Sequence, residues 1–228
     1  MIPGLAPGVS IGRMPLSRRV VYPLCLLAGS LLAVVAGALH PDIAGQDGPS
    51  QLAVIAQSRA WPAIHWAFLF SFPLSLLGLV GVVGRHVGTA GESPARAGVM
   101  LATFAYALWV IIVAFMGGAG WALAHSFATA DAGMTATRAV FLFDMLRPFA
   151  LDAQRVGGFA LGLATALFGW GVLDGKVLPR WLGSAALAAG GVGIVLALLF
   201  REDTKADQAA FVLPVVWQLV TAVVMLRG

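Results

Sequence analysis

The chain has 228 residues, of which 60% are hydrophobic and only 11% charged, and its formal net charge at pH 7 is +4. Soluble globular domains carry about 25% charged residues, so this composition excludes an ordinary soluble protein and a disordered chain. It predicts an all-α protein that crosses a membrane several times and contacts lipid. The sequence has no basic and aromatic stripe that would indicate a nucleic-acid partner, and its single cysteine, Cys25, excludes an intrachain disulfide.

Stretches without Asp, Glu, Lys or Arg recur along the chain, and most are about 20 residues long, the length that a helix needs to cross a ~30 Å hydrocarbon core. They are too long and too uniform for membrane β-strands. We therefore predict one domain over residues 18–228 with six transmembrane helices. The expected spans are about 20–39, 61–84, 98–124, 153–173, 181–200 and 209–226.

The N-terminal region, residues 1–17, is rich in Pro and Gly and is predicted to be a disordered cytoplasmic tail. Arg18 and Arg19 precede the first apolar run, an arrangement that resembles a secretory signal. The run exceeds the 7–15 residues of a signal core, so we interpret it as a retained first helix.

Basic residues in the loops predict the orientation, because cytoplasmic loops carry an excess of Lys and Arg. With the N-terminus inside, the cytoplasmic side holds more Lys and Arg than the other side, so both termini are predicted to be cytoplasmic. The predicted external loops, 40–59 and 126–152, are the longer ones, so we expect any site to open outward. Pro49 and Ser50 in the first of them are typical of a helix start and predict a short helix over 51–58 on the membrane surface.

Small residues recur at four-residue spacing in the later spans. Such stripes let helix backbones approach closely. We expect them to form tight helix contacts, either within the chain or with a protein partner or a second copy. The residues are Gly158, Gly162 and Ala166 in the fourth span and Ala185, Ala189, Gly193 and Ala197 in the fifth, and three further glycines (117, 118 and 120) cluster in the third.

Three of the four histidines fall on the predicted external side: His40, His65 and His125. His65 and His125 are expected at equal depth, where facing imidazoles can bind the iron of a b-type haem. Together with His40 they could instead bind a single copper or zinc ion. Each has the alternative role of a polar anchor at the membrane interface. His86, at the cytoplasmic end, is interpreted as an interfacial residue only.

Four charged residues precede the fourth span: Asp144, Arg147, Asp152 and Arg155. On one helix they fall within an arc of about 140°, and their spacing allows pairs three residues apart. They are either a solvated helix face or charges that line a water-filled vestibule. Arg155 is also a candidate contact for a haem propionate.

Motifs for catalysis are missing from the sequence: it has no HExxH, no GxSG, no phosphate-binding GKS/T loop and no dinucleotide fingerprint. We therefore predict no catalytic residue and leave open whether the protein is an enzyme.

The segment Gly175–Gly183, a glycine-rich helix after it, and the sequence LPVVW at 213–217 are similar to uncharacterised six-helix bacterial membrane proteins grouped as domains of unknown function. The resemblance implies six helices and a bacterial inner membrane, and it implies no activity or site. Three functions therefore stay open. The chain is a membrane subunit that binds haem or a metal at its external mouth, a small transporter or channel-like protein with an outward vestibule, or a structural partner subunit without chemistry.

Overall fold

The structure is a computed structural model that describes residues 16–130, 134–200 and 204–227. The predicted disordered tail lies outside the described residues, except that its last two positions begin the first helix. The helices are α1 (Leu16–Leu39), α2 (Gly48–Gln57), α3 (Trp61–His86), α4 (Glu92–Ala114), the π-helix η1 (Phe115–Gly120), α5 (Trp121–Thr129), α6 (Met134–Gly175), α7 (Arg180–Leu199) and α8 (Lys205–Arg227).

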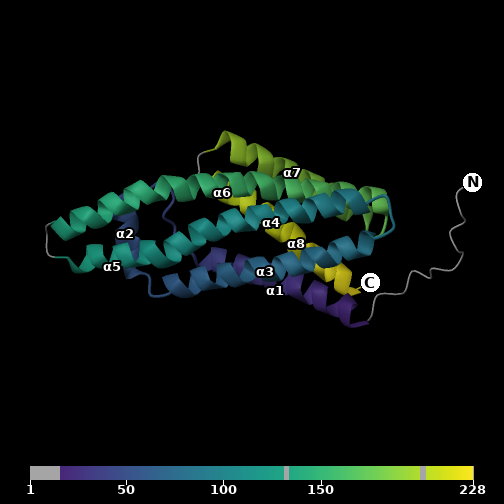
Figure 1. The fold of residues 1–228 in the computed structure, drawn as a ribbon, viewed down its shortest axis with the longest axis horizontal. Coiled ribbons are helices and arrows are strands. Elements are labelled where there is room, and N and C mark those ends of the chain that lie inside the picture. Colours follow the sequence, from purple (N-terminus) through teal and green to yellow (C-terminus); the bar gives the residue numbers. More distant parts are fainter. Residues whose placement is uncertain (1–15, 131–133, 201–203, 228) are drawn as a thin grey trace, which may run out of the picture.

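Six helical segments are long and apolar enough to cross a membrane, and they confirm the predicted all-α bundle. They are α1, α3, the continuous rod α4–η1–α5, α6, α7 and α8. In the bundle α6 packs on both α4 and α7, α1 packs on α3, and α8 contacts both α7 and α1 (Figure 1). We call the end where α1 stops and α3 begins the His40 end, at the left of Figure 1, and the opposite end the His86 end.

Two helical rods, α4–η1–α5 and α6, extend beyond the other helices at the His40 end (Figure 1). At 1.5 Å per residue the 42-residue α6 is about 63 Å long, roughly twice the hydrocarbon core of a bilayer. The region expected as a long loop, 126–152, is therefore largely helix. A search for stretches without charged residues does not detect this part of α6, because one face of the helix carries charged side chains there. Its other face buries Ala139, Phe143 and Ala150, spaced as on one side of a helix.

The short helix expected in the first long loop is present as α2. Its N-cap is Asp47, whose carboxylate accepts a 2.9 Å hydrogen bond from the Ser50 N–H. The side chains of Leu52 and Ile55 are completely buried, because α2 packs on α5 and α6. Protein, rather than lipid headgroups, thus covers the apolar face of α2.

Small residues bring α6 and α7 together, as expected for the fourth and fifth spans. A Cβ atom on Gly162 would lie 2.9 Å from the Gly190 carbonyl oxygen, and one on Gly169 would lie 2.7 Å from that of Gly183. On α7 the contact includes Gly193 as predicted, but Ala185 is exposed and Ala189 only half-buried. Gly183, Ala186 and Gly190 are the buried small residues in that part of α7, so the predicted stripe was wrong there in its register.

Candidate functional site

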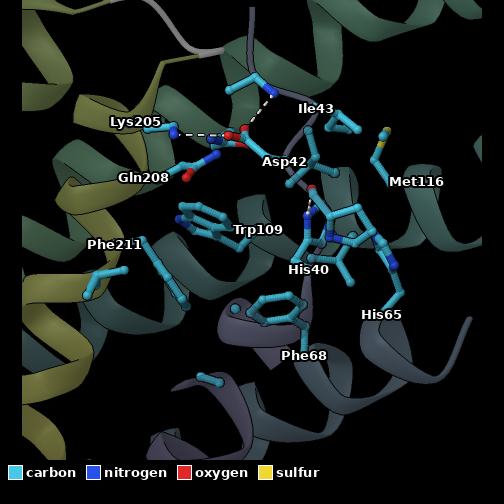
Figure 2. A pocket seen from close by; sticks show the side chains of 18 of the residues that line it. His40, Asp42, Ile43, His65, Phe68, Trp109, Met116, Lys205, Gln208 and Phe211 are labelled. Atoms are coloured by element: carbon cyan, nitrogen blue, oxygen red, sulfur yellow. Dashed lines mark hydrogen bonds and ion pairs between the residues drawn. The ribbon is translucent and has the colours of Figure 1, made fainter. Parts of the chain in front are cut away.

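A cavity of about 620 Å³ lies at the His40 end among α1, α3, α4, α6 and α8 (Figure 2). This volume falls within the roughly 300–1,000 Å³ of small-molecule sites. Most of the lining is apolar, contributed by residues such as Ala33, Phe68, Ile112, Val113, Phe211 and Val215. The polar and charged lining residues are His40, Asp42, Gln51, His65, Arg147, Gln154, Lys205 and Gln208.

His40 and His65 line one wall of the cavity, and their rings form a cluster with the buried ring of Trp61. The His40 ring lies 5.4 Å from the His65 ring, measured between centroids, and Trp61 contacts both, at 4.8 Å and 4.5 Å. Nδ1 of His40 is 2.8 Å from the Pro41 carbonyl oxygen, and Nδ1 of His65 is 2.8 Å from that of Trp61. Carbonyls only accept, so Nδ1 donates in both rings, and in a neutral ring Nε2 then keeps its lone pair.

The π-helix η1 fixes the His65 side of this cluster. The Trp61 indole N–H donates a 2.8 Å hydrogen bond to the Met116 carbonyl oxygen within η1. Next to it, a Cβ on Gly117 would lie 2.7 Å from Cβ of His65, so only glycine allows α3 to approach this closely. Of the three clustered glycines noted in the sequence, Gly117 thus serves the packing of His65.

At the polar end of the cavity, Asp42 lies near His40 and forms an ion pair of 3.0 Å with Lys205 (Figure 2). The hydrogen bond from Lys205 is the main reason that the pKa of Asp42 lies below its usual value. Burial lowers the pKa of His40, because desolvation of the cation outweighs its hydrogen bond to Pro41 and the attraction of Asp42. The polar end of the cavity therefore holds a neutral imidazole beside an ion pair at pH 7.

The loop between α1 and α2 covers this end. The Gln51 amide donates to the carbonyl oxygens of Ile43 and Gln46, at 3.0 and 3.1 Å. Arg147, reaching from α6, donates through Nη1 to the same Gln46 carbonyl oxygen at 3.1 Å. The loop is thus held from both α2 and α6.

His125 lies away from this cluster. It is exposed on α5, and its ring contacts that of Trp121 at 4.1 Å. The structure brings His65 together with His40 and not with the predicted partner His125. Among the described residues, no group of three His, Cys, Asp or Glu side chains is arranged to hold a metal ion.

The four charged residues of the predicted vestibule lie on one helix, α6, and their surroundings differ. Arg147 lines the cavity. Arg155 donates through Nε and Nη2 to the carbonyl oxygens of Ala197 and Leu198, at 2.8 and 3.0 Å, and so satisfies the last turn of α7. Asp144 and Asp152 are exposed.

His86 differs from the interfacial residue that we expected. Its side chain is completely buried at the end of α3, and neither ring nitrogen has a hydrogen-bond partner in the described part of the chain. A Cβ on Gly91 or on Gly175 would lie 2.7 or 2.5 Å from its Nδ1. The ring therefore fills a space that two glycines leave between α4 and α6.

A second polar contact lies in the middle of the bundle, and the sequence reading missed it. The Tyr106 hydroxyl on α4 donates a 2.9 Å hydrogen bond to Oε1 of Gln218 on α8, and it also bonds to Ser75 on α3. All three side chains are buried. A search for ionisable residues within the spans overlooks such neutral groups. A single glutamine in an apolar span nevertheless indicates a hydrogen bond to a neighbouring helix.

The chain matches no family model, and no curated protein and no solved structure is similar to it. The cavity and the residues around it are therefore the basis for assigning a function.

Proposed function

We propose that the protein binds a small amphipathic molecule in the cavity at the His40 end. The observation that carries this proposal is the separation of polar and apolar lining within one cavity. On α8 the lining changes along the helix from Lys205 and Gln208 to Phe211, Val212 and Val215. A ligand with a polar head and an apolar body matches both parts, and a few polar groups in an apolar pocket are typical of ligand sites.

A single metal ion at His40 and His65 is the second candidate. Metal-ligating histidines usually donate their other ring nitrogen to a carbonyl or carboxylate, and both rings do so here. A b-type haem has less support, because His125 is exposed on α5 and Arg155 binds the carbonyls of α7.

We also propose, from the loop charges and the sequence resemblance, that the protein lies in a bacterial inner membrane with both termini in the cytoplasm. The cavity then faces the outer side of that membrane, as expected for a site that opens outward.

Filling the cavity tests the binding proposal. A Cβ on Gly37 would be 4.0 Å from the Phe68 ring, so Gly37→Phe places a second ring in the cavity without a backbone clash. Gly191 on α7, where a Cβ meets nothing within 4 Å, provides the matched control Gly191→Phe. We expect saturable binding of a water-soluble, short-chain fluorescent fatty acid to the purified protein. Gly37→Phe should weaken it at least tenfold, about 1.4 kcal/mol, and Gly191→Phe should not.

Equal binding by the Gly37→Phe variant and the wild type would refute a ligand in this cavity. The metal content of the same preparations decides the second candidate. A near-stoichiometric copper or zinc ion that His65→Gln removes would support it.

A further inference from the structure

The cavity shares its rim with the surface of the bundle. Val34 on α1 and Val212 and Val216 on α8 line the cavity, and they are also 37%, 48% and 44% exposed. In a membrane-spanning bundle, exposed valines within the spans face lipid. A residue that borders both the cavity and the lipid marks an opening, so the cavity opens sideways between α1 and α8.

The path of α8 explains this opening. Figure 1 shows α8 crossing the bundle obliquely, from beside α6 and α7 at the His40 end toward α1 at the His86 end. At the His86 end, Arg85 of α3 donates a 3.1 Å hydrogen bond to the Met225 carbonyl oxygen and holds α8 there. The helices that border the cavity therefore diverge toward the His40 end.

The depth of the cavity corresponds to one leaflet. The part of α8 that lines it, from Lys205 to Val216, is about 16 Å long at 1.5 Å per residue. Half of a ~30 Å hydrocarbon core is about 15 Å. On α8 the charged and amide side chains lie at the end nearest the membrane surface and the apolar ones below. A lipid of the nearer leaflet has the same order of polar and apolar parts.

The Asp42–Lys205 pair spans the polar end of the opening, because Asp42 follows α1 and Lys205 begins α8. Its two side chains are 59% and 80% exposed. Water screens the attraction between such exposed charges, so the pair contributes little to stability. An anionic headgroup oxygen can therefore replace Asp42 as the partner of Lys205 at small cost.

On the basis of the proposed function, we infer that the ligand is a phospholipid of the leaflet at the His40 end. It inserts an acyl chain sideways between α1 and α8, and its phosphate lies beside Lys205. The polar end of the cavity is then not the only route by which a ligand reaches the site.

Photochemical labelling tests this inference on the full chain in vesicles of phosphatidylglycerol that contain a trace of the same lipid with a diazirine in one acyl chain. We expect labelled peptides to concentrate at 33–38 and 211–216. The lipid-facing residues of α7, including Val192 and Val195, report ordinary lipid contact and should be labelled several-fold less. Uniform labelling of all lipid-facing helices would overturn the inference.

Bulky side chains at the rim provide the variants. Val212→Trp should reduce labelling at 33–38 several-fold, whereas the control Val195→Trp on α7 should not. Val216→Trp serves as a second rim variant if the first does not fold. If Gly37→Phe blocks the soluble fatty acid while rim variants leave lipid labelling unchanged, the proposed function stands and sideways access is wrong. If Gly37→Phe changes neither the binding of the soluble fatty acid nor the labelling by the diazirine lipid, both proposals fail.

Discussion

The contact of α6 with α7 yields a sharp stability prediction, because adjacent glycines on α7 have opposite surroundings. A Cβ on Gly190 would lie 2.6 Å from the Ala166 backbone nitrogen and closer still to the Gly162 carbonyl oxygen. A Cβ on Gly191 would meet nothing within 4 Å. The substitutions Gly190→Ala and Gly191→Ala therefore add the same methyl group at two places that differ only in what surrounds it.

The expected energies follow from these distances. Carbon atoms pack at about 3.5–4.0 Å, so the Gly190→Ala methyl group requires the two backbones to separate by about 1 Å. Overpacking of this kind costs typically 1–3 kcal/mol. Both variants gain the helix propensity of alanine, up to about 1 kcal/mol. The difference between them thus isolates the clash, and we expect Gly190→Ala to be the less stable by about 1–3 kcal/mol.

Unfolding in mixed micelles with increasing sodium dodecyl sulfate, followed by circular dichroism and tryptophan fluorescence, measures this difference. Gly191→Ala should unfold at or above the wild-type midpoint, and Gly190→Ala below it. Equal midpoints for the two variants would show that α6 and α7 do not meet at Gly190, and the small-residue register described above would then be incorrect.

Two further predictions concern polar contacts. Tyr106→Phe leaves Gln218 without its hydroxyl partner and should lower the free energy of unfolding by about 0.5–2 kcal/mol; the same change at the half-buried Tyr22 is the control, and equal losses would contradict the assignment. Lys205→Gln should raise the pKa of Asp42 toward its ordinary value, since Lys205 is the main cause of its lowering. The ion pair is fully formed above the ordinary pKa of Asp and is lost as the pH falls through the lowered one, so the carboxyl carbon resonance of Asp42 should titrate at higher pH in the variant.

The sequence predicts the number and order of the membrane helices well, because the absence of charge over about 20 residues reports directly on the cost of burying charge in lipid. It underestimates the helices that leave the membrane. In the first half of α6, Asp144 and Asp152 occupy an exposed face and interrupt every uncharged run. Only the helical spacing of the buried residues on the other face reveals that the helix continues.

The site was less predictable, since it depends on distances between helices. We paired His65 with His125 because both were expected at the same depth in the membrane. The depth of a residue does not show which helices are its neighbours. His40 follows α1, which packs on α3, and this neighbour relation places it beside His65. Similarly, the sequence around His86 does not show that it is buried, because Gly175, one of the two glycines that make room for its ring, lies 89 residues further along the chain.

The hydrogen bond between Tyr106 and Gln218 has a mechanical consequence. It fixes α8 in the middle of the bundle, and Lys205 lies about 20 Å from that point along the helix. A rigid α8 that pivots there by about 10° would carry Lys205 about 3 Å sideways. That displacement would separate Lys205 from Asp42, now 3.0 Å apart. A tilt of α8 about Gln218 would therefore also break the ion pair at the polar end of the cavity.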